Sequence, residues 1–206
     1  TLGERGIGSS GFRVVGAHTD SPGFRVKPAG AFPKDPVSAV GVEVYGAPIL
    51  ASFADRDLTL AGRVSLRDPS FGDGTRPELV AFDRPLLRLP NLAIHMNREV
   101  NREGLKFDLQ EQLPLFLGAL SEELPEGERF RRLVAERVGA EPGDILSWSL
   151  AVADTQPGAF WGGDDEFIAD GQLDNLASCH AALSALPERK EEGAALAALF
   201  DHEEVG

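Results

Sequence analysis

The sequence predicts an α/β domain that is interrupted by a smaller, β-rich inserted domain. Near each end of the chain an apolar strand, in residues 12–17 and again in residues 194–200, runs directly into polar residues. Between them lie many short β-type runs that are separated by Gly and Pro, which is typical of a small antiparallel domain. We therefore expect residues 1–28 and 158–206 to form the α/β domain and residues 29–157 to form the inserted domain.

Hydrophobic patterning and chain-breaking residues predict the individual elements. Helical patterns are expected in three places, residues 109–120, residues 128–138 and residues 175–186. Short strands are expected at residues 24–27, 40–45, 49–53, 58–66, 79–82, 92–95 and 145–152. Turns rich in Gly or in charged residues are expected at residues 6–11 and 187–193.

The composition is that of an ordinary soluble globular protein. Hydrophobic residues make up 42% and charged residues 26% of the 206 positions. The net charge of −13 argues against nucleic acid and against an anionic membrane as partners, because both need a basic surface. Cys179 is the only cysteine, so no internal disulfide can form. With no signal-peptide core at the start and no apolar run of about 20 residues, we expect a cytoplasmic protein.

Both ends of the sequence look truncated. The first residue is Thr1 rather than Met, and the chain stops at Gly206, directly after a cluster of acidic residues. We therefore expect the chain to be a fragment that lacks both ends of a longer protein.

The acidic residues near the C-terminus are candidates for binding a metal. Acids at the carboxyl end of a buried strand lie where open α/β sheets bind their ligands. Glu203 and Glu204 are adjacent, and successive side chains of an extended backbone point to opposite sides. One of them can therefore face a metal while the other faces a substrate or water. The alternative is a charged strand end that continues into a solvated loop.

Two earlier segments offer matching groups. His18 and Asp20 stand two positions apart at the end of a strand, where Asp20 can fix the tautomer and orientation of a metal-bound His18. The alternative for this pair is a surface turn. Asp174 precedes a predicted helix, and a carboxylate there can bridge two cations. The alternative for Asp174 is an N-cap, or a first-turn acid that interacts with the helix dipole.

The combination of these groups is more specific than any one of them. His18, Asp174 and Glu204 provide one imidazole and two carboxylates, and Glu203 is left beside them. A hydrolase with two metals needs such a set, namely a bridging carboxylate, terminal His and Glu ligands, and a base that takes a proton from metal-bound water.

Five motifs resemble those of the aspartyl aminopeptidase family, and they occur in the family's order through essentially the whole chain. They are Gly16-Ala17-His18-Thr19-Asp20-Ser21-Pro22-Gly23, Asp55-Arg56-Asp57-Leu58, Leu92-Ala93-Ile94-His95-Met96-Asn97-Arg98, Leu173-Asp174-Asn175 and Asp201-His202-Glu203-Glu204-Val205-Gly206. Members of this family are di-zinc exopeptidases that remove acidic residues from peptide N-termini. The resemblance implies a catalytic αβα-type domain with a mixed sheet, interrupted by an inserted β-rich oligomerisation domain.

The resemblance also implies a role for each candidate residue. His18 is similar to a ligand of one zinc, Asp174 to the bridging ligand and Glu204 to a ligand of the other zinc. Glu203 is similar to the general base, and Asp20 to the group that orients the histidine ligand.

Two further features are implied by the family. One is a cis peptide bond between Asp174 and Asn175. The other concerns His95, which by this resemblance reaches the site of a neighbouring subunit and stabilises the tetrahedral intermediate; the alternative is a satisfied histidine at a strand end. The remaining histidines, His180 and His202, are interpreted as structural residues.

The expected function is a metal-dependent aminopeptidase that removes N-terminal Asp or Glu, with two Zn²⁺ per site (or Mn²⁺ or Co²⁺) in a homo-oligomer. In the family, a later segment supplies one more acidic ligand, a terminal histidine ligand and the basic residue that receives the substrate's acidic side chain. None of these can be assigned in this sequence. The alternatives are another di-metal aminopeptidase or a deacylase, or, for this chain alone, an inactive fragment with an incomplete metal site.

Overall fold

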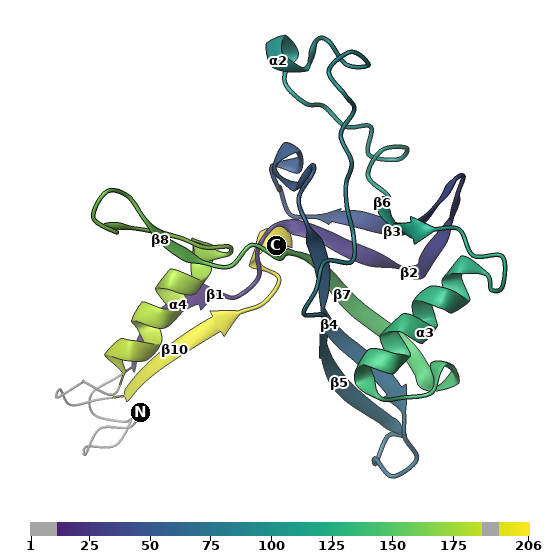
Figure 1. The fold of residues 1–206 in the computed structure, drawn as a ribbon. Coiled ribbons are helices and arrows are strands. Elements are labelled where there is room, and N and C mark those ends of the chain that lie inside the picture. Colours follow the sequence, from purple (N-terminus) through teal and green to yellow (C-terminus); the bar gives the residue numbers. More distant parts are fainter. Residues whose placement is uncertain (1–11, 187–193) are drawn as a thin grey trace. The chain divides into compact units, whose positions relative to one another are not determined.

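The computed structural model describes residues 12–186 and 194–206, and the chain divides into two compact units (Figure 1). The first unit consists of Thr1–Pro22 and Pro157–Gly206, and the second unit consists of Gly23–Gln156. A parallel strand pair lies in the first unit and an antiparallel sheet in the second. This mixed α/β architecture confirms the predicted fold class.

The second unit begins earlier than the sequence indicated. The expected boundary at residue 28 lies inside β2 (Gly23–Lys34), which pairs with β3 (Val37–Tyr45) from Gly23 onward. Residues 23–28 therefore belong to the second unit, because their backbone hydrogen bonds are made there. At the other end the unit stops at Gln156, one residue before the expected boundary.

The first unit is built on two parallel strands, β1 (Phe12–His18) and β10 (Ala194–Phe200). Their register runs from Phe12 opposite Ala194 to His18 opposite Phe200, so both strands end level. Because parallel strands point the same way, the segments that follow His18 and Phe200 begin side by side at one edge. Such an edge is where α/β sheets hold their ligands.

One α-helix, one hairpin and a short 3-10 helix, η3 (Glu203–Val205), complete the described part of the first unit. Helix α4 (Leu173–Ala185) packs against β1, and the hairpin of β8 (Ala159–Trp161) and β9 (Phe167–Ala169) precedes it along the chain. Small side chains are buried in this unit, which allows the helix to lie close to the strands. They are Ala17, Cys179, Ala182 and Ala194.

The second unit is a six-stranded sheet in the order β5-β4-β7-β2-β3-β6. Besides β2 and β3, its strands are β4 (Leu58–Arg67), β5 (Thr75–Ala81), β6 (Leu115–Ala119) and β7 (Ile145–Asp154), and every neighbouring pair is antiparallel. Helix α3 (Glu126–Val138) packs against β2 and β5.

The core of the second unit is closed by Phe130 of α3. Its buried ring meets the ring of Trp148 edge-on, with centroids 5.6 Å apart. Beneath it lies Gly30, within an irregularity of β2, where an added Cβ would stand 2.7 Å from the ring of Phe130. Since Gly30 also has a φ of 66°, only glycine fits this position without strain.

Two of the predicted strands are absent. Residues 49–53 form a short 3-10 turn, η1 (Leu50–Phe53), because the N–H and hydroxyl of Ser52 both bond back to the carbonyl of Ile49. Residues 92–95 lie outside the sheet, and the side chains of Leu92 and Ile94 are more than half exposed. Both short apolar runs lack a partner strand. Their composition predicted strands, but composition alone does not provide the pairing that a strand needs.

The helix predicted at residues 109–120 is also wrong. Its first part is a turn in which the Asp108 side chain accepts the N–H groups of Gln110 and Glu111. Pro114 then cannot continue a helix, because it lacks an N–H. The chain instead enters β6, where Leu115 is buried and pairs with Val40 of β3. Pro114 was evidence against a helix, but the prediction gave more weight to the apolar pattern.

The other predicted elements are present with shifted ends. They are the strands at residues 12–17, 24–27, 40–45, 58–66, 79–82, 145–152 and 194–200 and the helices at residues 128–138 and 175–186. The turns expected at residues 6–11 and 187–193 lie outside the described residues.

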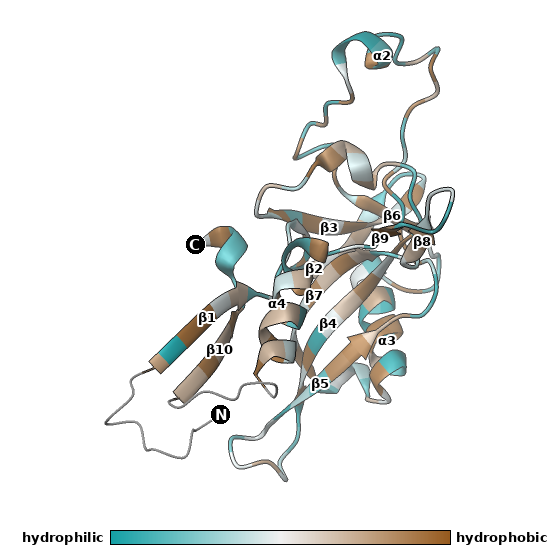
Figure 2. Ribbon diagram, turned by 90° about the vertical axis from the view of Figure 1, so that its left-hand side faces the viewer, coloured by the Kyte–Doolittle hydropathy of each residue, from teal (hydrophilic) through white to brown (hydrophobic). Residues whose placement is uncertain are grey.

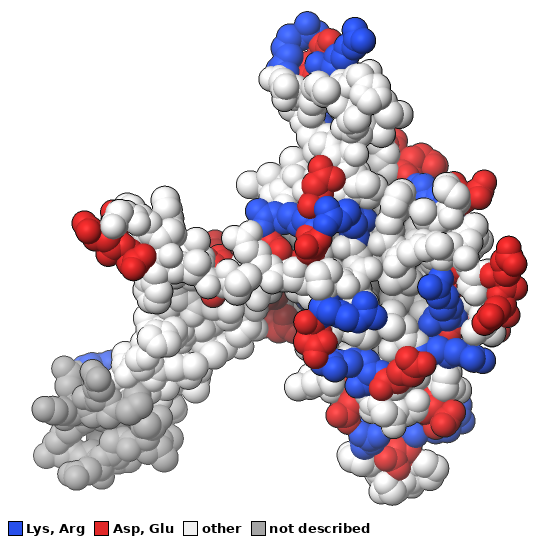
Figure 3. All heavy atoms as spheres, in the orientation of Figure 1, with Lys and Arg blue, Asp and Glu red and all other residues white. Residues whose placement is uncertain are grey.

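A long arm, residues 90–112, extends from the second unit and carries the short helix α2 (Val100–Glu103). Figure 2 shows that hydrophobic and hydrophilic residues alternate along it. On the face seen in Figure 3, Lys and Arg are interleaved with Asp and Glu over the second unit rather than gathered into one basic patch. None of the helices in residues 12–186 and 194–206 has the length and apolar character needed to cross a membrane.

The second unit buries one charged side chain, Glu126, among its described residues. Its Oε1 accepts the N–H of Ser121 at 2.7 Å, and Arg129 Nη1 lies 3.6 Å from Oε2. Burial acts to raise the pKa of the Glu126 carboxyl, but the Ser38 hydroxyl, the Ser121 N–H and the Arg129 guanidinium hold that pKa below its ordinary value. Because the folded pKa is the lower one, the carboxylate stabilises the fold above the unfolded pKa of about 4.3, and this contribution is lost as the pH falls through the folded pKa.

We expect Glu126→Gln to reduce the free energy of unfolding near neutral pH and to matter progressively less as the pH drops below about 4. Urea unfolding followed by Trp fluorescence at several pH values measures this difference. The exposed Glu136 on the same helix provides the matched control variant, Glu136→Gln. Equal pH dependence for the two variants would contradict a special role of the buried carboxylate.

Candidate metal centre

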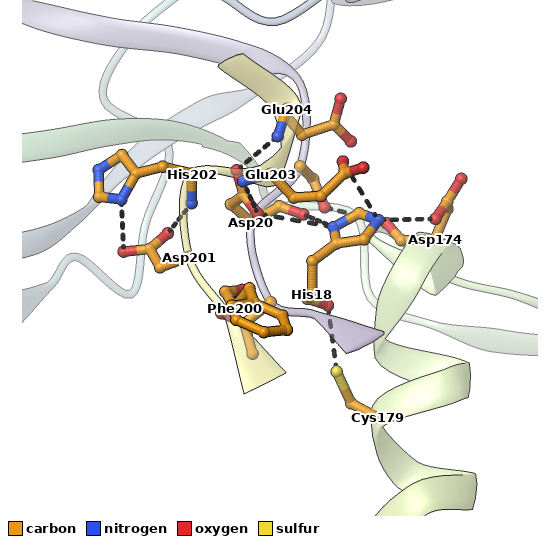
Figure 4. Close-up of polar contacts among 11 residues, drawn as sticks. His18, Asp20, Asp174, Cys179, Phe200, Asp201, His202, Glu203 and Glu204 are labelled. Carbon is orange, nitrogen blue, oxygen red and sulfur yellow. Dashed lines mark hydrogen bonds and ion pairs between the residues drawn. The ribbon is translucent and has the colours of Figure 1, made fainter. Parts of the chain in front are cut away.

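The ends of β1 and β10 are fastened to each other just where the acidic segment begins. The N–H and the hydroxyl of Thr19 both donate to the carbonyl of Phe200, at 2.8 and 3.1 Å. These bonds continue the parallel pairing by one residue, since His18 and Phe200 are the last register partners. His18 and the residues after Phe200 are therefore held at one edge of the strand pair (Figure 4).

Three carboxylates, two of candidate ligands (Asp174 and Glu204) and one of the candidate base (Glu203), lie around the ring of His18. Its Nε2 lies 3.4 Å from Oδ1 of Asp174 and 3.7 Å from Oε2 of Glu203. One ligand atom each of His18, Glu203 and Glu204 also lies within 4.8 Å of the other two. Oxygen and nitrogen atoms that share one zinc at 2.0–2.2 Å stand roughly 3 to 4 Å from each other. The spacing of these side chains therefore suits a shared cation.

The electrostatic surroundings of His18 are strongly negative. Burial acts to lower the pKa of its imidazole, but the hydrogen bond to the Asp20 carbonyl and the carboxylates of Glu203, Asp174 and Asp20 together raise that pKa above its ordinary value. A site that favours a proton on the imidazole in this way also favours a metal cation in its place.

Asp20 does more than the sequence indicated. The Nδ1 of His18 lies 3.0 Å from the backbone carbonyl of Asp20 and 3.5 Å from its carboxylate, so the main-chain carbonyl is the nearer partner of the ring. The carboxylate itself is buried and accepts the N–H groups of Glu203 and Glu204, at 3.2 and 3.1 Å. Asp20 thus positions the backbone of both glutamates as well as lying beside the histidine.

Asp174 stands at the irregular start of α4. Asp174 and Asn175 have non-helical backbone angles, and the peptide bond between them is cis, as the resemblance implies. The N-cap of this helix is Gln172, and no side chain caps it, so Asp174 is not the N-cap; it is an acid of the first turn, the other form of that alternative. The hydroxyl of Ser21 donates to the carbonyl of Asp174 at 3.0 Å, while the Asp174 side chain itself is exposed.

The remaining histidines lie elsewhere. His95 is exposed in the arm of the second unit, so it is not among the residues gathered at His18. His180 is exposed on α4, and His202 is exposed with its Nδ1 3.6 Å from the carboxylate of Asp201. The alternative of a strand end for His95 is wrong, since residues 94–96 form a turn.

Sequence reasoning missed three supporting residues. Thr19 and Ser21 lie between and beside the residues of the His-x-Asp motif, and their hydroxyls bond to Phe200 and Asp174, respectively. The third is Cys179, whose Sγ donates to the carbonyl of His18 at 3.1 Å. The hydroxyls could have been noticed because they adjoin the motif, whereas the thiol offered no signal before the helix was placed.

Comparison with known proteins identifies the family of the chain. The family model described as "Aminopeptidase I zinc metalloprotease (M18)" matches residues 2–206. The chain belongs to the M18 family. The probable M18 family aminopeptidase 2 of Ectopseudomonas mendocina is 43% identical over 210 residues, which cover 100% of this chain and 47% of that protein.

Solved M18 structures share the fold. A chain in the cryo-EM structure of the Ape4 and Nbr1 complex matches with a TM-score of 0.91 and 30% identity, covering 100% of this chain and 43% of that one. The mApe1 dodecamer of S. cerevisiae matches with a TM-score of 0.69 and 20% identity, over 94% of this chain and 44% of that one. The chain thus spans about half the length of the M18 proteins that it matches.

The contacts of Asp20 generate a prediction that needs no metal. In Asp20→Asn, one carboxylate oxygen becomes an NH₂ group that cannot accept a hydrogen bond, so one of the two N–H groups loses its partner. Hydrogen bonds to charged groups contribute about 1.5–3 kcal/mol, so amide exchange at Glu203 or Glu204 should accelerate by roughly tenfold or more. Residue-resolved hydrogen exchange measures this rate.

The control is Asp201→Asn, which alters an exposed carboxylate of the same segment that accepts the N–H of His202. It should leave the exchange of Glu203 and Glu204 unchanged. Unaltered exchange in Asp20→Asn would show that the buried carboxylate does not hold this segment.

Proposed function

We propose that the chain is the part of a zinc aminopeptidase that carries His18, Asp174, Glu203 and Glu204, and that the enzyme removes N-terminal Asp or Glu from peptides. The convergence of these side chains at the ends of β1 and β10 is the observation that carries the proposal. Because the chain spans about half the length of its relatives, we propose that it acts within a polypeptide of their length.

The donor set fits zinc. One imidazole nitrogen and several carboxylate oxygens are ligands that Zn²⁺ accepts, although Mn²⁺ and Co²⁺ accept them as well. In the proposal His18 would hold one zinc and Glu204 the other, and Asp174 would be the ligand that both share. When bound, the pair supplies Lewis acidity towards the scissile carbonyl and lowers the pKa of the attacking water.

The protein's own groups divide the remaining work. Glu203 accepts the proton of the attacking water and later delivers it to the leaving amine, which requires a carboxylate within hydrogen-bond reach of that water. Asp20 keeps Glu203 and Glu204 in place through their backbone N–H groups. The negative surroundings of His18 also suit the α-ammonium group of a peptide substrate. From the arm, His95 stabilises the tetrahedral intermediate in the site of a neighbouring subunit.

The oligomeric state and location complete the proposal. A homo-oligomer is supported by the exposed apolar residues of the arm and by the dodecamer reported for mApe1 of S. cerevisiae. In this proposal the second unit is the oligomerisation domain, and the enzyme is cytoplasmic. Its charge of −13 argues against nucleic acid and anionic membranes as partners.

A second candidate keeps the metal pair and changes the substrate, as in another di-metal aminopeptidase or a deacylase. The acidic specificity depends on a basic residue that cannot be assigned in this chain, so it rests on the resemblance of the motifs. The continuation Ser21-Pro22-Gly23 and the long inserted unit favour the first candidate. A third possibility is that the 206 residues alone are inactive, because each zinc would have fewer than the usual four ligands.

Hydrolysis of Asp- or Glu-initiated peptides by the protein of family length tests the function. We expect turnover of these peptides to exceed that of Leu- or Ala-initiated peptides, to disappear with a chelator and to return with Zn²⁺. Activity that is indifferent to chelation would eliminate the metal mechanism, and equal turnover of all peptides would favour the second candidate. If the 206-residue chain alone binds no more than one metal ion tightly, this would support the interpretation as an inactive fragment.

The division of roles between the acids has its own test. Glu203→Gln should lower kcat by about a hundredfold or more while the metal content stays near that of the wild type, because a general base is lost but the ligands remain. Asp174→Ala should lose metal. Asp201→Ala, in the same exposed segment as Glu203, is the control and should change neither quantity. Equal metal loss in the Glu203 and Asp174 variants would contradict the assignment.

A further inference from the structure

The motif Asp55-Arg56-Asp57 takes no part in the candidate metal centre, yet many hydrogen bonds of the second unit converge on it. The segment, which we call the Asp55–Asp57 turn, connects η1 to β4. Asp55 has a φ of 59°, a left-handed backbone that Asp and Asn tolerate better than most residues. Its contacts lead to two different parts of the chain.

On one side, the turn holds the root of the arm. The N–H of Asp55 donates to the carbonyl of Leu89 at 2.9 Å, and its Oδ1 accepts the N–H of Asn91 at 3.0 Å. Arg88 donates from Nη1 to the carbonyl of Asp55 at 2.8 Å and from Nη2 to the carboxylate of Asp57. The residues just before the arm and at its start are therefore bound to one turn.

On the other side, the turn holds the last residues of the second unit. The N–H and the hydroxyl of Thr155 donate to the carbonyl of Asp57 at 3.0 and 2.8 Å. Arg56 pairs with the carboxylate of Asp154 at the end of β7. The turn thus ties the root of the arm to the end of a central strand, so the arm cannot pivot there without breaking these bonds.

Beyond its root, the limb that leads to His95 makes few contacts with the rest of the second unit. Leu92, Ile94 and Met96 are more than half exposed, and the backbone hydrogen bonds of residues 93–104 are local to the arm. The returning limb is held separately, by Phe107, which packs against the core, and by Lys34, whose Nζ donates to the carbonyl of Glu111. The side chain of Asp55 reaches Asn91, four positions before His95. The direction in which the chain leaves Asn91 therefore determines the position of His95.

We propose that Asp55 is a positioning residue for His95, acting through the N–H of Asn91 and supported by Arg88. The inference rests on the proposed function, which gives His95 its role in a neighbouring subunit's site. Asp55 itself touches no substrate in this scheme. Its effect on the reaction passes entirely through the direction of the arm.

The first experiment compares two substitutions of Asp55 in the oligomeric protein of family length. Asp55→Ala removes the acceptor and should lower kcat by roughly tenfold with little change in KM, because the substrate site is intact. Asp55→Asn keeps one acceptor oxygen and favours the same left-handed backbone, so it should restore most of kcat. The control Asp73→Ala removes a similar side-chain acceptor, which bonds the N–H of Thr75 in the β4–β5 loop, and should leave kcat unchanged.

The second experiment measures the arm directly. Arg98, Arg102 and Lys106 are tryptic sites within it. Losing one hydrogen bond of ordinary net strength should raise the cleavage rate in the arm of Asp55→Ala about fivefold. Arg88→Lys loses the forked contact with Asp55 and Asp57. Like Asp55→Ala, it should raise the cleavage rate and lower kcat. It serves as the test if Asp55→Ala fails to fold.

A double-mutant comparison separates this inference from the proposed function. In a His95→Ala background, Asp55→Ala should cause no further fall in kcat, because the group that it positions is gone. An unchanged kcat in His95→Ala alone would instead refute the role of His95, and with it the proposed function of the arm. If His95→Ala lowers kcat, two results would overturn the inference. One is an Asp55→Ala variant whose cleavage rate and kcat equal those of the wild type. The other is a double variant in which Asp55→Ala lowers kcat by the same factor as it does in the wild-type background.

Discussion

The buried carboxylate of Asp20 is the contact on which the candidate centre depends. An ionised group removed from water is costly unless its oxygens find donors. Here the donors are the backbone N–H groups of Glu203 and Glu204, which belong to the same segment that supplies the acidic side chains. The hydrogen bonds to the Asp20 carboxylate therefore form at the same time as Glu203 and Glu204 are brought next to His18. The glutamate side chains remain free to bind because only their backbone is used.

The frame for this contact is the level ending of β1 and β10. A shift of one residue in their register would move His18 away from Phe200 and turn the following side chains to the other face. Thr19 secures the register on the strand side, while Ser21 connects the same segment to Asp174 at the start of α4. Four consecutive residues, from His18 to Ser21, thereby contact every element that contributes to the centre.

Much of this arrangement could be predicted because it follows from local patterns. Apolar runs that stop at polar residues marked the ends of β1 and β10, and the helix after Asp174 had a regular pattern, so the placement of His18, Asp174, Glu203 and Glu204 at these ends could be read from the sequence. The double use of Asp20 could not be predicted, since it depends on a contact 183 residues away along the chain. Pro114 illustrates the opposite case, in which a local signal was present but was outweighed by its apolar neighbours. The position of His95 in a turn required knowing that its short apolar run has no partner strand.

In the sequence, the second unit is inserted between β1 and α4, and this insertion affects the order in which the chain folds. Thr19 and Phe200 are 181 residues apart, yet they must bond for the strand pair to close. Arg25 and Ala151, near the two ends of the second unit, pair within its sheet. Once that sheet has formed, the loop to be closed is roughly threefold shorter, which lowers its entropic cost by about 1 kcal/mol. During synthesis the insertion can fold while β10 is still unmade, and the acidic centre is then assembled after the insertion.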